Sequence, residues 1–183
     1  MIERIWGSLS LNTHETNYFK AAVMHCTRHF YSQSNAMIHP AAAMRIADPF
    51  ARNCRIAEPF DNDIDPGTDA THHMDAKDFL KTLAKNEFDL IIFDPPFSSN
   101  QAGRYGDANI YTKGRGYVPE CMKLILMALK PNGLMIKFGF NSTRHMKQFE
   151  LEKLYVVNHG GNHNDTLVSI WRKAEHTLEE WIG

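Results

Sequence analysis

A continuous apolar run that ends in an acid constrains the fold of this chain more than any other feature. The run from Phe88 to Phe93 is apolar at every position except Asp89, and Asp94 follows directly. Such a run is typical of a strand that is buried on both faces of a parallel sheet. Because parallel strands need long crossover connections, the run predicts an α/β fold in which helices cover the sheet.

Shorter patterns before and after this run predict the rest of the sheet. Apolar stretches bounded by turn residues indicate strands, and apolar residues at helical spacing indicate helices. The expected strands, besides 88–94, are 44–50, 56–60, 72–75, 134–140, 151–158 and 166–172, with a turn at 131–133. The expected helices are 75–86, 119–129, 143–149 and 174–182, with further helical segments within 12–44. The last two strands predict a hairpin that adds an antiparallel strand to one edge of the sheet.

The length and composition fit one globular domain. The chain has 183 residues, of which 43% are hydrophobic and 22% are charged, close to the globular average. A chain of this size can bury most of its apolar surface without disulfides or metals. We expect a single domain over 1–183, with a helical N-terminal extension at 1–43 and the core at 44–172.

Cysteine use and hydropathy indicate a cytoplasmic protein. The three cysteines are odd in number and far apart, which argues against a disulfide framework and suits a reducing compartment. The first ten residues lack the apolar core of a signal peptide. No stretch approaches the roughly 18 consecutive apolar residues that span a membrane, so we expect no membrane partner.

The overall charge neither requires nor excludes a nucleic-acid partner. The chain has 20 basic and 21 acidic residues and a formal net charge of -1. It therefore lacks the basic excess of a protein that coats a duplex. An enzyme that contacts one base and a few phosphates needs only a local basic patch.

Acids follow several of the expected strands. Ligands of open parallel sheets bind at the carboxyl ends of the strands, where such acids would converge. A single Asp at such a position often caps a helix or forms a turn instead. Because several acids recur at this one edge, we interpret them as a binding site. They are Asp48, Asp61, Asp63, Asp65, Asp75 and Asp94.

The segment Asp94-Pro95-Pro96-Phe97 has the chemistry of an amine-binding site. The two prolines fix φ and remove two N–H donors, which leaves a stiff loop that presents carbonyl acceptors. The Asp94 carboxylate and the Pro95 carbonyl can accept both hydrogens of an NH2 group. Phe97 offers a flat face for a heterocycle, a stacking contact worth about 1–3 kcal/mol per base. A rigid corner with a buried Phe is the alternative, and the preceding buried strand favours the active site.

The segment Asp94-Pro95-Pro96-Phe97 resembles the (D/N)-P-P-(Y/F) motif of those class I S-adenosylmethionine-dependent methyltransferases that act on exocyclic or amide nitrogens. The Asp form is most often that of DNA adenine methyltransferases, and the layout is similar to small methyltransferase-like proteins of bacteriophages. The segment Asp48-Pro49-Phe50-Ala51-Arg52-Asn53-Cys54 resembles the D-x-F-x-G-x-G cofactor motif of the same enzymes.

The resemblance covers about residues 44–172 and carries expectations for fold, cofactor and site. It implies a Rossmann-like, mostly parallel sheet with a C-terminal antiparallel hairpin strand, and S-adenosylmethionine as the cofactor. It implies a catalytic role for Asp94, Pro95, Pro96 and Phe97, which would hold adenine in DNA. The residues that it assigns to the cofactor are Asp48, Phe50, Asp63 for the ribose hydroxyls and Asp75 for the adenine amine.

The chain departs from the family pattern at two points. Arg52 and Cys54 stand where the cofactor motif has glycine, a residue that lets the backbone approach a ligand closely. About a dozen residues separate Phe50 from Asp63, so the first crossover helix must be shortened. These departures keep open a catalytically degenerate methyltransferase fold that acts as a binding or inhibitory protein. An RNA or protein-glutamine methyltransferase is a second alternative, because the same four-residue motif serves those substrates.

A basic and aromatic loop at 98–117 is the expected contact with the methyl acceptor. Basic and aromatic residues interleave with glycines there, as in a flexible contact with phosphates and bases, although an ordinary solvated loop would look similar. The substrate-binding residues that we predict are Arg104, Tyr105, Lys113 and Arg115. The ten histidines form no complete four-ligand pattern, so we expect no metal. A homodimer that encloses DNA is a further expectation.

Overall fold

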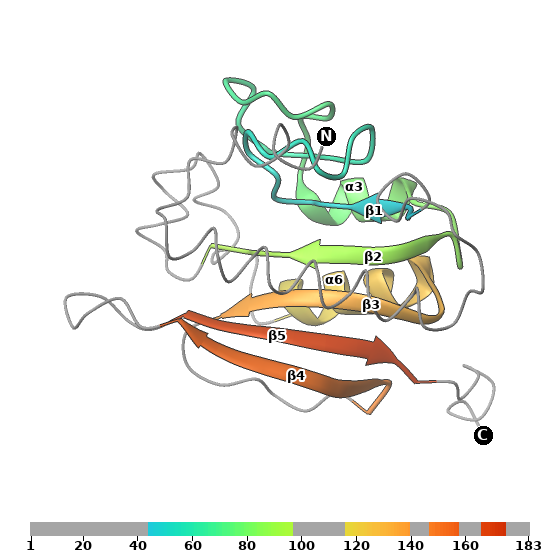
Figure 1. Cartoon of the computed structure of the whole chain (residues 1–183). Coiled ribbons are helices and arrows are strands. Elements are labelled where there is room, and N and C mark those ends of the chain that lie inside the picture. Colours follow the sequence, from blue (N-terminus) through green and yellow to red (C-terminus); the bar gives the residue numbers. More distant parts are fainter. Residues whose placement is uncertain (1–43, 97–115, 140–146, 158–165, 175–183) are drawn as a thin grey trace, which may run out of the picture.

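The structure of the chain is a computed structural model that describes residues 44–96, 116–139, 147–157 and 166–174, and the fold is that of these residues. Five strands form one sheet, and two helices pack against one of its faces (Figure 1). The strands are β1 (Ile46–Ala47), β2 (Phe88–Phe93), β3 (Leu129–Gly139), β4 (Phe149–Val157) and β5 (Thr166–Lys173), and the helices are α3 (Ala76–Thr82) and α6 (Tyr117–Ala128).

The sheet is parallel on one side and antiparallel on the other. Its order is β1-β2-β3-β5-β4, with β1, β2 and β3 mutually parallel. β5 runs antiparallel to β3, and β4 pairs antiparallel with β5 at the edge. The predicted α/β fold with a C-terminal antiparallel hairpin strand is therefore confirmed.

Two short chain segments continue the sheet beyond β1. Asp48 forms a parallel bridge with Asp61, and Asn62 forms a parallel bridge with His72. The strand expected at 44–50 is wrong in extent, because only Ile46–Ala47 and the bridge at Asp48 remain, and the strand expected at 72–75 shrinks to the single bridge at His72. The strand expected at 56–60 is wrong, because this stretch consists of turns. Pro49 and Pro59 explain much of this, since neither can donate a backbone hydrogen bond to a neighbouring strand.

The connection from β1 to the bridge at Asp61 contains turns and no helix. Residues 49–60 are all described, and hydrogen bonds of turn type link Cys54 to Ala51 and Phe60 to Ala57. The Glu58–Pro59 peptide bond is cis. The expectation of a shortened first crossover helix is confirmed, and in this chain the helix is replaced altogether by turns.

The two helices begin and end for local reasons. Asp75 caps α3, because its carboxylate accepts a hydrogen bond from the Lys77 backbone N–H at 3.0 Å. α3 ends at Thr82, four residues earlier than expected, since Leu83 is already extended. Pro119 lies in the first turn of α6, where an N–H has no partner within the helix. No helix among the described residues is long and apolar enough to cross a membrane.

The turn predicted at 131–133 is an irregular part of β3 rather than a separate connection. The pairing of β2 with β3 shifts between Phe88↔Leu129 and Leu90↔Leu134, which loops out the residues between. Asn132 has a φ of 61°, and a Cβ at Gly133 would lie 2.9 Å from the Lys130 carbonyl oxygen. The close approach of the backbone explains why glycine occupies this position.

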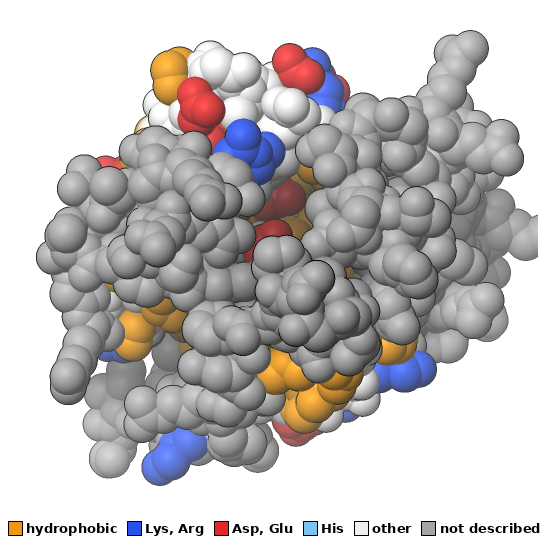
Figure 2. Space-filling model, turned by 90° about the vertical axis from the view of Figure 1, so that its left-hand side faces the viewer, with side chains coloured by type: hydrophobic (Ala, Val, Ile, Leu, Met, Phe, Trp, Pro, Cys, Tyr) orange, Lys and Arg blue, Asp and Glu red, His pale blue; other side chains and the backbone are white. Residues whose placement is uncertain are grey.

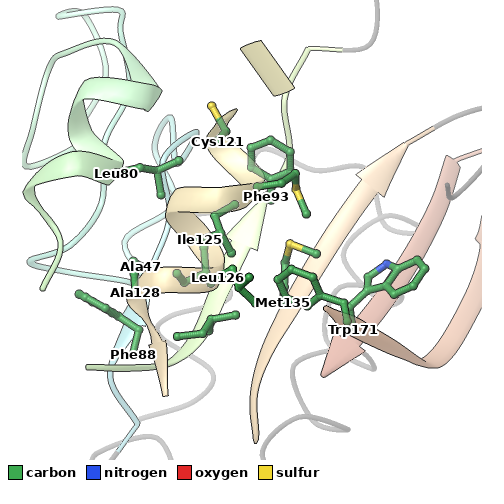
Figure 3. Packing of buried hydrophobic residues seen from close by; sticks show 14 of the residues in the cluster. Ala47, Leu80, Phe88, Phe93, Cys121, Ile125, Leu126, Ala128, Met135 and Trp171 are labelled. Carbon is green, nitrogen blue, oxygen red and sulfur yellow. The ribbon is translucent and has the colours of Figure 1, made fainter. Parts of the chain in front are cut away.

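Apolar side chains fill both faces of the central strands. Ile91 and Phe93 of β2 pack with residues of α3 and α6, including Leu80 and Ile125 (Figure 3). Leu90 belongs to a second buried cluster on the opposite face. Burying a side chain of this size stabilises the fold by about 1.5–3 kcal/mol. The prediction that 88–93 is buried on both faces is confirmed.

Several expected segments fall partly or wholly outside the described residues. These are the N-terminal extension at 1–43, the loop at 98–115, and most of the helices expected at 143–149 and 174–182. The last residue of the first of these helices, Phe149, is the first residue of β4 instead. The predicted domain boundaries stay a prediction.

Candidate active site

The candidate site lies at the carboxyl ends of the parallel strands. Asp48 follows β1 and Asp94 follows β2, and these strands are adjacent and parallel. Figure 2 views the molecule from the side to which the β2 and β3 arrows of Figure 1 point, and it shows acidic side chains set back in a recess. The fold thus brings two of the predicted site residues together at one edge, as the order of acids along the chain predicts.

Backbone hydrogen bonds place two more acids beside Asp48. The Asp48 N–H donates to the Phe60 carbonyl at 2.9 Å, and the Asn62 N–H donates to the Asp48 carbonyl at 2.8 Å. Side chains alternate along an extended segment, so Asp61 and Asp63 point to the same side, and Asn62 points away from them. The bridge of Asp61 with Asp48 therefore sets the acids of both segments next to each other.

Asn62 holds three chain segments in place. Its side-chain amide donates to the Pro49 carbonyl at 3.1 Å and to the Met74 carbonyl at 3.0 Å. Its carbonyl oxygen accepts a hydrogen bond from the Met74 N–H at 3.1 Å. The residue is fully buried. We did not single it out from the sequence, where only its place between two acids distinguishes it.

Asp48 is a buried acid with a strongly perturbed protonation equilibrium. It is 4% exposed, and one carboxylate oxygen accepts a hydrogen bond from the Phe50 N–H at 3.0 Å. Burial is the largest cause that raises the pKa of Asp48 from 3.8 to about 8; the charges of Asp94, Asp61 and Asp63 contribute to this rise, and the hydrogen bond from the Phe50 N–H opposes it. The carboxyl group therefore holds a proton at neutral pH.

Asp61 is one of the acids that the sequence predicts at this edge, but the sequence assigned it no role of its own. The sequence places it among the acids of the region but gives no reason to choose it over Asp63. The structure buries it completely, at 0% exposure, and among the described residues neither of its carboxylate oxygens has a hydrogen-bond partner. A buried polar group without a partner is costly and calls for a functional explanation.

Asp63 has partners in the neighbouring turns. Its carboxylate accepts hydrogen bonds from the Arg52 N–H at 3.2 Å and the Asp65 N–H at 2.9 Å. It is 6% exposed. Burial raises the pKa of Asp63, whereas the two N–H donors and the Arg52 guanidinium lower it.

Arg52 and Cys54, which replace the glycines of the cofactor motif, both face these acids. Arg52 has a φ of 49°, in the left-handed region that glycine adopts without strain. Arg52 therefore takes a backbone conformation that glycine adopts more easily, and it places a cation beside Asp63. Burial, together with the charges of Asp48 and Asp61, raises the pKa of the Cys54 thiol to about 12, so this side chain is neutral.

Phe50 lies between the site and the core. Its ring makes an edge-on contact with Phe93, with ring centroids 5.7 Å apart and planes at 65°. The side chain is half-buried and packs against the core cluster on the helical side of the sheet. Its predicted contact with the cofactor stays a prediction.

Asp75 is held by a second, separate group of residues. Besides capping α3, both of its carboxylate oxygens accept hydrogen bonds from the Tyr117 hydroxyl, each at 3.1 Å. Burial raises the pKa of Tyr117 above its usual value. The charges of Asp94, Asp61 and Asp63 act on Asp48. Asp75 is linked to this group through its neighbour Met74, whose backbone carbonyl accepts a hydrogen bond from the Asn62 side chain. The tie between Asp75 and Tyr117 was not predicted, because 42 residues separate them.

The predicted methyl-acceptor site is described only in part. Asp94 is exposed at the end of β2, and Pro95 and Pro96 are half-buried. The remaining predicted residues, Phe97, Arg104, Tyr105, Lys113 and Arg115, lie outside the described residues. Among the residues that the structure describes, no group of three or more His, Cys, Asp or Glu side chains could hold a metal ion.

Comparison with known proteins identifies the fold. No protein-family model matches the chain, and no curated protein sequence matches it. The solved structure of the N-methyltransferase NodS from Bradyrhizobium japonicum WM9 matches with a TM-score of 0.54 at 12% identity, over 91% of this chain and 100% of that chain. TrmN from Thermus thermophilus matches with a TM-score of 0.50 at 18% identity, over 73% of this chain and 46% of that chain. The chain therefore has a Rossmann-like α/β fold of the kind found in the methyltransferase NodS.

Proposed function

We propose that the chain is an S-adenosylmethionine-dependent methyltransferase that transfers a methyl group to an exocyclic amine, with adenine in DNA as the acceptor. The observation that carries the proposal is the placement of Asp94-Pro95-Pro96 directly after β2, beside the buried acids at the end of β1. An amine-binding loop and a set of acceptors for a cofactor thus share one edge of a fold that methyltransferases also use.

The donors of the proposed cofactor fit the acceptors of the site. S-adenosylmethionine carries a methyl group on a positively charged sulfur, which is the electrophile that it supplies when bound. Its ribose hydroxyls, its ammonium group and its adenine amine all donate hydrogen bonds, and carboxylates are the strongest acceptors for such groups. Asp61 fits best, because both of its oxygens lack a partner among the described residues. The other residues that would hold the cofactor are Asp48, Phe50, Asp63 and Asp75.

The chain's own residues would orient the methyl acceptor. Asp94 and the Pro95 carbonyl hold the two hydrogens of the amine, and Phe97 stacks on the base after it leaves the duplex. The stiff proline pair keeps these acceptors in place, so most of the rate gain comes from orientation. The proton that the amine loses goes to Asp94 or to water. Arg104, Tyr105, Lys113 and Arg115 would contact the phosphates and neighbouring bases.

A non-catalytic binding protein is the second candidate, and one observation favours it. Arg52 and Cys54 stand where the cofactor motif has glycine, and Arg52 interacts with Asp63 and Cys54 with Asp48. Side chains at these positions restrict how closely a ligand can approach the backbone. This candidate predicts a folded chain that binds no S-adenosylmethionine.

The decisive experiment measures methyl transfer from labelled S-adenosylmethionine to DNA, RNA and cell-extract protein. We expect label in DNA, at adenine. We expect Asp94→Ala to lower the rate on the order of hundredfold, with little change in affinity for the cofactor. Asp94→Asn should retain intermediate activity, since the motif accepts either residue.

Asp69→Asn is the matched control, because Asp69 is an exposed acid of the same region. It should leave the rate unchanged. Label in RNA or protein alone would replace the DNA acceptor and keep the reaction. Absence of transfer together with absence of cofactor binding would reject the enzyme and support the binding protein.

A further inference from the structure

The buried carboxylate of Asp61 has no partner within the described part of the chain. It is completely shielded from solvent, and neither oxygen accepts a hydrogen bond there. Asp61 shares its side of the segment with Asp63 and is bridged to Asp48. Its charge raises the pKa of Asp48, so the two carboxyl groups interact. An acid in such a place is stabilised when a cation or a hydrogen-bond donor enters the site.

The charges around this acid are mostly negative. Asp94 at the end of β2 and Asp63 on the same segment as Asp61 both act on Asp48. Arg52, from the turn after β1, is the cation that acts on Asp63. Cys54, from the same turn, is a neutral thiol. In a water-poor recess, a fixed excess of negative charge favours a cationic ligand through its field as well as through direct contacts.

We propose that Asp61 makes this site select the cationic methyl donor over the spent cofactor, and that Arg52 limits that preference. The inference rests on the proposed function. When the carbon–sulfur bond breaks and the methyl group joins the amine nitrogen, the sulfur keeps the electron pair and becomes a neutral thioether. S-adenosylhomocysteine therefore lacks one positive charge of S-adenosylmethionine, and the acids favour its release.

The test measures dissociation constants of both ligands by titration calorimetry, which does not depend on turnover. We expect the wild-type chain to bind S-adenosylmethionine on the order of tenfold more tightly than S-adenosylhomocysteine. Asp61→Asn should bring the two constants to within about twofold of each other. The control Asp69→Asn should keep the wild-type ratio.

Arg52→Gly is a second variant with the opposite expected effect. It removes the cation beside the acids, and glycine accepts the φ of 49° without strain, so the variant should fold. We expect it to increase the ratio of the two constants severalfold. This variant keeps the proposal testable if circular dichroism shows that Asp61→Asn is unfolded.

Protonation of Asp48 gives an additional prediction. The preference for the cationic ligand should increase as the pH rises through about 8, where the Asp48 carboxyl ionises according to its pKa. Asp48→Asn should lack the part of this pH-dependent increase that comes from Asp48. Titration of the ligands themselves affects the wild-type chain and the variant alike.

The outcomes separate this inference from the proposed function. Equal affinities for the two ligands in the wild-type chain, or an unchanged ratio in both Asp61→Asn and Arg52→Gly, would overturn the selection by charge and leave the methyltransferase intact. Absence of binding by either ligand to a folded wild-type chain would overturn the proposed function, and this inference with it.

Discussion

The first residue after β1 is an acid whose charge is decided by its neighbours. Asp48 is buried, accepts one backbone hydrogen bond, and faces three other carboxyl groups. Burial disfavours its ionised form most strongly, and the nearby negative charges add to this effect. At neutral pH the protonated carboxyl of Asp48 lowers the repulsion within the group of acids. A bound cation would instead favour the ionised form of Asp48.

Asp48 should make the chain less stable as the pH rises. Its pKa is 3.8 in the unfolded chain and about 8 in the folded chain, so the folded state binds the proton more tightly. The resulting stabilisation is complete below the unfolded pKa and is lost as the pH rises through the folded pKa. Urea unfolding at a series of pH values measures this loss, which is at most about 1.4 kcal/mol per pH unit.

Asp48→Asn is the comparison that isolates this group. Asparagine has nearly the same shape and carries no titratable proton, so the free energy of unfolding of the variant should improve relative to wild type between pH 3.8 and about 8. Acids that do not interact with Asp48 contribute equally to both proteins, so the difference between the two curves reports on Asp48 together with the acids coupled to it. Parallel stability curves for the two proteins would show that Asp48 has an ordinary pKa.

The two helices are tied to each other at their N-terminal ends. Asp75 caps α3, and Tyr117 at the first turn of α6 donates its hydroxyl to the same carboxylate. α6 also packs its apolar side against the sheet, with Cys121 and Ile125 in the core (Figure 3). The segment that precedes α6 is the predicted substrate loop, so this tie fixes one end of that loop relative to the site.

Tyr117→Phe should weaken this tie without disturbing the core. The ring still fills its buried position, but the hydrogen bond to Asp75 is lost, at a cost of about 1 kcal/mol in the free energy of unfolding. Chemical denaturation measures the change. Lys77→Gln is the control, since it removes the exposed ion pair with Glu120 and a cation–π contact with the Tyr117 ring but leaves the hydroxyl in place, and it should have little effect. Equal effects of both changes would contradict the role assigned to the hydroxyl.

At the scale of the whole molecule, the candidate site lies at the β1 side of the sheet, where the strand pairing is least regular. β2 pairs in continuous register with β3 from Leu90↔Leu134 to Phe93↔Lys137, whereas the segments beyond β1 pair through single bridges and are held by the side-chain hydrogen bonds of Asn62. Hydrogen bonds between turns, rather than a continuous strand ladder, hold these segments. A ligand that contacts Asp48, Asp61 and Asp63 would therefore add contacts where the sheet pairing is shortest.

Cofactor binding should therefore stabilise the whole chain. A ligand that binds only the folded state raises the free energy of unfolding by about 2.7 kcal/mol at a hundred times its dissociation constant. We expect saturating S-adenosylmethionine to move the urea midpoint accordingly, and free methionine, which lacks the adenosyl group, to leave it in place. A urea midpoint that does not change when S-adenosylmethionine is added would favour the non-catalytic binding protein.

The sequence by itself determined the features that depend on neighbouring residues. The apolar run of β2, interrupted only by Asp89, predicted a strand buried on both faces, because an apolar stretch of that length has few other stable environments. Asp48 and Asp94 were placed at the same edge, since acids that follow parallel strands meet there. The distance from Phe50 to Asp63 was too short for a full crossover helix, and the structure shows turns instead.

Only the tertiary structure decided which acids meet and which are satisfied. Nothing local distinguishes Asp61 from Asp63; the pairing of Asp61 with Asp48, and the N–H groups that reach Asp63, depend on hydrogen bonds between segments distant in the chain. The hydroxyl of Tyr117 reaches Asp75 across 42 residues for the same reason. Strand register and helix docking are set by burial summed over the whole sheet, and no short window of sequence contains that sum.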